Sequence, residues 1–145
     1  MEPKDRELYH NWIQTLLVEC AGERTAPISE SLMKCAAAHY QSMNMDSVLR
    51  PLKGNLPGLI DMLQTDWGWI VSHDHHAKTI VADENKPTCV CPLFREGLVD
   101  SPLLCDCSRG FASRMFEFVL DHPVQTTIVQ SVLRGANSCV YRIDY

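Results

Sequence analysis

Two short cysteine pairs, thirteen residues apart, carry the clearest chemical signal in the sequence: residues 89–91 read Cys-Val-Cys and residues 105–107 read Cys-Asp-Cys. Alternate residues of an extended strand point to one face, so each pair would present its two thiols together. If the chain between the pairs folds back, four sulfurs converge, as a tetrahedral zinc ion or an iron–sulfur cluster requires. The pattern therefore predicts a metal or ligand site made of Cys89, Cys91, Cys105 and Cys107. The single residue within each pair is a shorter spacing than zinc knuckles usually have.

Thiol chemistry is a second interpretation of the same residues. Cys107 directly precedes the expected start of a helix at Ser108 or Arg109, where unpaired N–H groups and the helix dipole stabilise a thiolate. A lowered pKa would make Cys107 the nucleophile of a cysteine-dependent hydrolase, or the reactive member of a dithiol redox pair with Cys105. Asp106 opposes this effect with its negative charge. In a third interpretation, the cysteines are small buried side chains that fill the core.

The first half of the chain offers a further thiol and a histidine. Cys35 shares a predicted helix face with Leu32 and Ala36, and the alanines after it leave room for a sheet or a ligand to approach closely. We expect Cys35 to reach the site from this side. His39, one turn later, offers a base for it, but a histidine satisfied at the edge of the core is the favoured interpretation. The three histidines within residues 73–76 crowd a polar turn, which favours solvent exposure over metal binding.

Size and charge exclude several classes of protein. With 145 residues, 46% of them hydrophobic, the chain has the composition of one globular domain. Thirteen basic against eighteen acidic residues give a net charge of −5, without the basic surface on which nucleic-acid binding depends. No run approaches the roughly 18 apolar residues of a membrane span, and no apolar segment follows the polar residues 1–5. We expect no nucleic-acid or membrane partner and a reducing, cytoplasmic location in which the seven cysteines are thiols rather than disulfides.

Hydrophobic periodicity divides the chain into a helical half and a mixed half. Apolar residues recur every three or four positions in segments 5–21, 27–39 and 56–63, which predicts three helices. Later segments predict strands at 67–71, 79–82 and 89–91, a covering loop at 92–102, a helix up to 122, and a hairpin of 124–133 and 138–145 around a turn at 134–137. The expected fold is α+β in a single domain, 1–145. N-terminal helices (1–64) precede an antiparallel sheet with a ββ(β)-α-ββ C-terminal half (65–145) that holds the cysteine cluster.

Two motifs carry a resemblance to a known family. Residues 105–111 read Cys-Asp-Cys-Ser-Arg-Gly-Phe at a helix start, and residues 131–139 read Ser-Val-Leu-Arg-Gly-Ala-Asn-Ser-Cys in the last hairpin. Together they resemble the closing α-β-β unit of the 4-vinyl reductase type of domain, a small-molecule-sensing fold. The resemblance implies zinc ligands at the helix start and at both ends of the hairpin turn. Cys105 and Cys139 match two of these positions, whereas Ser131 stands at the third and leaves Cys89 and Cys91 as replacements.

The stretch from Asp83 through both cysteine pairs to the hairpin is similar to an uncharacterised bacterial family, with a looser match around Cys35. The general shape of the hairpin is also similar to thiazoline-carboxylate hydrolases, which implies a reactive cysteine. These resemblances imply a small-molecule ligand, are compatible with a homodimer, and supply no reaction. We therefore expect a small-molecule- or metal-binding domain, with a sensor as one role; the alternative is a cysteine-dependent hydrolase or dithiol redox enzyme acting through Cys107 or Cys105. The expected ligand-binding residues are Cys35, Cys89, Cys91, Cys105 and Cys107.

Overall fold

The computed structural model describes residues 2–22, 28–98 and 101–145, and it confirms the α+β class expected from the sequence. Four strands form one antiparallel sheet in the order β1-β2-β4-β3. The strands are β1 (Ile70–Asp74), β2 (Thr79–Asp83), β3 (Gln125–Gln130) and β4 (Val140–Asp144). The α-helices are α1 (Pro3–Gly22), α2 (Ile28–Ser42), α3 (Met45–Leu49), α4 (Leu56–Thr65), α5 (Pro92–Arg95) and α6 (Leu104–Leu120), and two 3-10 turns are η1 (Arg50–Leu52) and η2 (Val132–Arg134).

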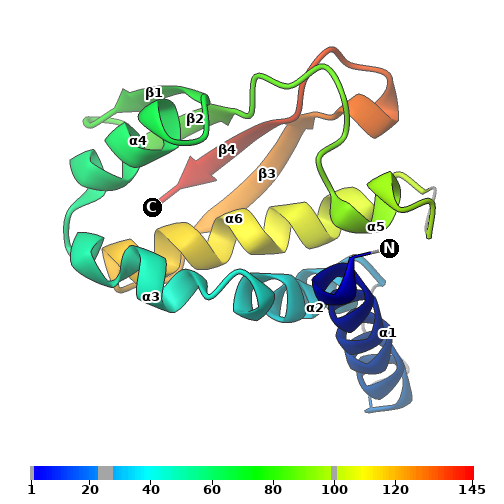
Figure 1. Cartoon of the computed structure of the whole chain (residues 1–145). Coiled ribbons are helices and arrows are strands. Elements are labelled where there is room, and N and C mark those ends of the chain that lie inside the picture. Colours follow the sequence, from blue (N-terminus) through cyan, green and yellow to red (C-terminus); the bar gives the residue numbers. More distant parts are fainter. Residues whose placement is uncertain (1, 23–27, 99–100) are drawn as a thin grey trace.

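Helix α6 lies between the sheet and the N-terminal helices (Figure 1). It covers the face of the sheet that β3 and β4 present, while α2 and α3 pack on its opposite side, and α1 packs against α2. The core between α6 and the sheet contains the fully buried side chains of Phe116, Val119, Ile80 and Ile143. Within the three described segments, no helix combines the length and the apolar character that crossing a membrane requires.

Gly110 sets the distance between α2 and α6. A Cβ atom at this position would overlap the backbone of Met33 and come within 2.9 Å of the Cβ of Ala36. Glycine lacks that atom, so the two helix backbones approach closely here. The expectation that the alanine-rich run after Cys35 faces a sheet or a ligand is therefore wrong, because helix α6 occupies that space.

Helix α6 begins earlier than predicted, at Leu104 rather than at Ser108 or Arg109. Ser101 and the proline after it lead into the helix: the N–H of Leu104 donates to the Ser101 carbonyl at 3.0 Å. The N–H of Leu103 donates to the Ser101 hydroxyl at 3.3 Å, so Ser101 satisfies a backbone donor just before the helix.

The early start of α6 changes the geometry of the second cysteine pair. Cys105 and Cys107 both lie in the first turn of the helix rather than in extended chain. Positions two apart in a helix differ by about 200° around its axis, whereas in a strand they share a face. The two thiols therefore point in different directions.

The strand predicted through residues 89–91 is also wrong, because residues 84–91 run from β2 to α5 without regular secondary structure. Pro87 and Pro92 bracket this segment, and proline has no N–H to give to a strand ladder. Part of the loop predicted at 92–102 forms the short helix α5 instead, with Pro92 in its first turn. Residues 99–100 of that loop lie outside the described residues.

The C-terminal hairpin is confirmed. Strands β3 and β4 pair antiparallel, with Thr126 opposite Ile143 and Ile128 opposite Tyr141. The register shifts between Ile128 and Gln130, and the connection contains the 3-10 turn η2 rather than a tight turn at 134–137. Two other bounds differ from the prediction: the first strand begins at Ile70 rather than residue 67, and helix α3 was not expected.

Candidate functional site

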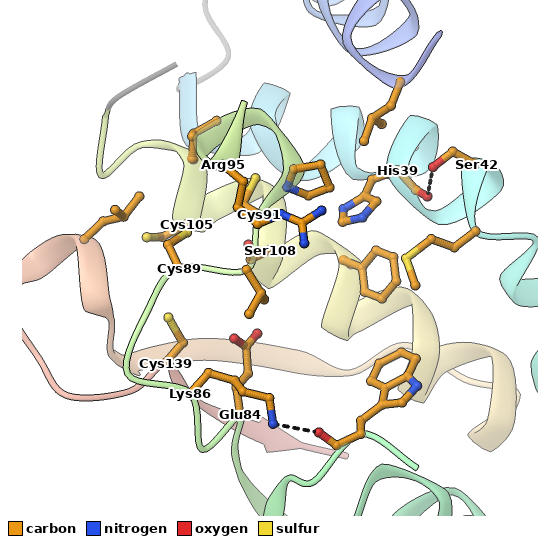
Figure 2. A pocket seen from close by; sticks show the side chains of 18 of the residues that line it. His39, Ser42, Glu84, Lys86, Cys89, Cys91, Arg95, Cys105, Ser108 and Cys139 are labelled. Atoms are coloured by element: carbon orange, nitrogen blue, oxygen red, sulfur yellow. Dashed lines mark hydrogen bonds between the residues drawn. The ribbon is translucent and has the colours of Figure 1, made fainter. Parts of the chain in front are cut away.

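A cavity of about 460 Å³ opens where the start of α6 meets α1, the end of α2, α5 and the inward face of the sheet. Residues from distant parts of the sequence line it together (Figure 2). Its walls consist of apolar and aromatic side chains, a group of thiols, and a few charged groups. A concave, mainly apolar site with few convergent polar groups is typical of small-molecule binding.

Four cysteines contribute to the lining of this cavity: Cys89, Cys91, Cys105 and Cys139. The structure thus brings together three of the cysteines expected from the two pairs and adds Cys139 of the hairpin. Cys107 does not line the cavity, and neither does Cys35, which is fully buried in α2. The sulfur of Cys107 accepts a hydrogen bond of 3.3 Å from the indole N–H of Trp12 in α1, on another side of α6.

The hairpin meets the start of α6 at Cys105. The thiol of Cys105 donates a hydrogen bond of 3.3 Å to the hydroxyl of Ser131, which is almost fully buried. The sulfur of Cys139 accepts a hydrogen bond of 3.4 Å from the N–H of Val132, at the other end of the same connection. The three positions singled out by the family resemblance, 105, 131 and 139, therefore lie together in space.

Burial keeps most of these thiols protonated. It raises the pKa of Cys89 and Cys91, and it raises the pKa of Cys139 to about 11. The expected lowering of the pKa of Cys107 at a helix start is wrong, because burial raises it to about 12. A thiol in an apolar environment without a cation beside it is a poor nucleophile at neutral pH.

Glu84 brings a carboxyl group into the same cavity. It directly follows β2, and its N–H donates to the Cys139 carbonyl at 2.9 Å, which continues the pairing of β2 with β4. One carboxylate oxygen accepts a hydrogen bond of 3.1 Å from the phenol of Tyr141. Burial raises the pKa of Glu84 to about 7, so its charge changes near neutral pH.

The opposite wall of the cavity carries Arg95 and His39, and the buried carboxyl of Asp5 from α1 also belongs to the lining. Arg95 of α5 directs its guanidinium into the cavity, across from the carboxylate of Glu84 (Figure 2). His39, at the end of α2, lies beside it with its ring 4.8 Å from that of Phe111. Burial, with the nearby charge of Arg95, lowers the pKa of His39 to about 4, so the imidazole is neutral at neutral pH. His39 thus faces the cavity, whereas Cys35 does not line it. His39 is therefore not placed to act as the base of Cys35 within the cavity.

Aromatic rings form much of the apolar wall. The ring centroids of Trp67 and Trp69 lie 5.7 Å apart, and Trp69 stacks on Tyr141 at 6.4 Å. Phe111 of α6 closes the side toward α2, with Leu104 at the start of the same helix. Flat aromatic faces favour a ligand with an apolar or aromatic body.

The four cysteines that line the cavity offer the ligand type of a metal site, but they are not arranged in the geometry of one. Thiolates are the ligands that zinc and iron–sulfur clusters prefer. Within residues 2–22, 28–98 and 101–145, however, no three histidine, cysteine or acidic side chains are grouped closely enough to hold a metal ion. Metal binding here therefore requires the thiol side chains to rearrange.

The polar turn at 73–76 lies away from the cavity. The histidines of the polar turn are exposed, and His73 shares a hydrogen bond of 2.7 Å with the phenol of Tyr145. The side chain of Cys20 lies outside the described residues.

Sequence reasoning missed Glu84, Arg95 and Tyr141 as site residues. A signal for Glu84 was present, since it is the next inward position after Ile80 and Ala82 along β2. Tyr141 alternates with Cys139 in the same way on β4. Arg95 had no comparable signal, because it enters the cavity through a helix that the sequence pattern did not indicate.

Neither a protein-family model nor a curated protein matches this sequence. The fold and the site define the protein as a class: an α+β domain whose cavity combines thiols, a buried carboxyl and an arginine. Because one fold supports many functions, the role of the protein follows from the chemistry of the cavity.

Proposed function

We propose that this protein binds a small organic ligand in the cavity, and that the ligand has a largely apolar body and an acidic group. The observation that carries the proposal is an aromatic-walled cavity of about 460 Å³ into which Arg95 points. That volume is within the usual range of small-molecule sites. The resemblance of the C-terminal segment to a small-molecule-sensing domain supports the same role.

Arg95 and His39 are suited to bind the acidic group of the ligand. The guanidinium of Arg95 presents a fork of N–H groups that matches a carboxylate. His39 beside it is neutral at neutral pH and can add a hydrogen bond without a competing charge. The aromatic rings of Trp69 and Phe111 then cover the apolar body of the ligand.

Calorimetric titration with phenylacetate and cinnamate tests the proposal. We expect saturable binding with one site per chain, and we expect Arg95→Gln to weaken it by about tenfold, the effect of losing one charge-assisted hydrogen bond. Arg50→Gln is the matched control, because it removes the same charge from an exposed position outside the cavity. Absence of binding for both acids, or equal weakening by both variants, would contradict the proposal.

Metal binding is a second candidate function, favoured by the four cysteines that line one cavity: Cys89, Cys91, Cys105 and Cys139. Thiols can turn toward a common centre by rotating about single bonds, and metal binding releases their protons. Titration of the reduced protein with zinc tests this candidate. One tightly bound ion per chain supports it, and no binding above that of the unfolded chain contradicts it.

Catalysis by Cys107 has less support than binding. The thiol is buried against Trp12, does not line the cavity, and has a raised pKa. A nucleophilic cysteine needs a partly exposed, electropositive environment.

A further inference from the structure

Glu84 is a buried carboxyl group with unused hydrogen-bonding capacity. Its side chain is 9% exposed, and Oε1 accepts the hydrogen bond from Tyr141. In the described part of the protein no other side chain donates to it, and Figure 2 shows its carboxylate directed into the cavity. The ammonium of the neighbouring Lys86 donates to the Trp67 carbonyl at 3.0 Å, and among the ion pairs of the described residues none joins it to Glu84. The carboxylate of Glu84 can therefore accept further hydrogen bonds from a ligand in the cavity.

The ionisable groups around Glu84 do not supply it with a hydrogen-bonded cationic partner. Burial and the nearby charge of Asp83 both raise its pKa, and only the Tyr141 hydrogen bond and Lys86 act in the other direction. Three thiols in electrostatic contact with Glu84 are neutral at neutral pH: Cys89, Cys91 and Cys139. Arg95 lies on the opposite wall (Figure 2).

A cationic group of the ligand would both donate a hydrogen bond to Glu84 and compensate its charge. A buried carboxylate is costly unless a charged, hydrogen-bonded partner compensates it. The stacked rings of Trp69 and Tyr141 also line the cavity, and aromatic faces attract cations. A neutral hydroxyl group could fill the same hydrogen bond, but it would leave the charge uncompensated.

We propose, building on the proposed function, that the ligand also carries a basic nitrogen, which binds Glu84 while its acidic group binds Arg95. The ligand class is thus a small zwitterion, with an amine or amidine at one end, a carboxylate at the other, and an apolar or aromatic body between them. Glu84 fixes the orientation of such a ligand, because reversing it would place like charges together at both walls.

Three probes that share one aromatic body test this inference: para-toluate, para-(hydroxymethyl)benzoate and para-(aminomethyl)benzoate. In calorimetric titrations at pH 8, where Glu84 is ionised, we expect the aminomethyl compound to bind about tenfold or more tightly than the other two. At pH 6, where Glu84 is protonated, this advantage should shrink. Glu84→Gln should remove the advantage at both pH values.

Asp61→Asn is the control variant, because it removes the same charge from an exposed position on α4 outside the cavity. It should preserve the advantage of the amine. Equal affinity for the hydroxymethyl and aminomethyl compounds, or an advantage that survives Glu84→Gln, would overturn the inference while leaving the proposed function intact. If none of the three acids binds, the proposed function itself fails.

Discussion

The phenol of Tyr141 on β4 donates a hydrogen bond of 3.1 Å to the carboxylate of Glu84, 57 residues earlier in the chain. Both side chains are buried, and both line the cavity. The contact holds the carboxyl group at the junction of β2 and β4, where the backbone of Glu84 also pairs with Cys139. Glu84 therefore makes a structural hydrogen bond and also has a pKa near neutral pH, and it lies in the proposed binding site.

The raised pKa of Glu84 should make stability depend on pH. Between about pH 4.5 and 7 the folded protein holds a proton on Glu84 that the unfolded chain has lost, so the free energy of unfolding falls as pH rises. The loss reaches about 3 kcal/mol above pH 7, at about 1.4 kcal/mol for each pH unit. Urea unfolding across this range should show a flatter profile for Glu84→Gln than for the native protein or for Asp61→Asn. Parallel profiles would show that Glu84 is not a source of the pH dependence.

Thiol reactivity should follow exposure rather than position in the sequence. Cys89 is half-buried, whereas Cys35 and Cys107 are almost completely buried. Alkylation with iodoacetamide at pH 8, followed by peptide mass analysis, should modify Cys89 first and leave Cys35 and Cys107 protected until the protein unfolds. Alkylation in guanidinium chloride provides the control, since it should remove the differences. Rapid modification of Cys107 in the folded protein would restore the nucleophile hypothesis.

Replacement of Gly110 should destabilise the contact between α2 and α6. Glycine to alanine in an exposed helix is usually stabilising by about 1 kcal/mol. At Gly110 the added methyl group meets the Met33 backbone and Ala36, so we expect Gly110→Ala to lower the free energy of unfolding by about 1–3 kcal/mol instead. Urea denaturation measures both the sign and the size. A gain in stability would mean that the helices do not cross closely here.

Zinc titration of cysteine variants distinguishes two possible sets of zinc ligands, one that includes Cys139 and one that includes Cys107. If the cavity binds zinc, Cys105→Ser and Cys139→Ser should each weaken it strongly in chelator competition, because both residues line the cavity. Cys107→Ser should retain zinc affinity, because that sulfur lies against Trp12 outside the cavity. Circular dichroism verifies that each variant is folded. Loss of zinc in both Cys105→Ser and Cys107→Ser, with zinc retained in Cys139→Ser, would instead support the set of Cys89, Cys91, Cys105 and Cys107 expected from the sequence.

The elements that depend on local periodicity were predictable. The apolar spacing of residues 5–21 indicates the helix that the structure shows as α1, and alternation in the last twenty residues indicates the hairpin of β3 and β4. Both signals arise from side chains a few residues apart, so a single sequence contains them.

The composition of the site was predictable only in part, because it depends on contacts between distant segments. Cys105 and Cys107 point in different directions because the helix already begins at Leu104, three residues before Cys107. The place of Cys139 beside Cys105 depends on how the hairpin packs on α6, which local patterns do not encode. Arg95 reaches the cavity through the same kind of long-range packing.

The indole N–H signals of the three tryptophans offer the most direct test of ligand binding in the cavity. Trp67 and Trp69 line the cavity, whereas Trp12 is buried against Cys107 and does not. In proton–nitrogen NMR spectra, assigned with single Trp→Phe variants, titration with para-(aminomethyl)benzoate should shift the Trp67 and Trp69 signals and leave that of Trp12 in place. Unchanged Trp67 and Trp69 signals at saturating ligand would contradict binding in this cavity.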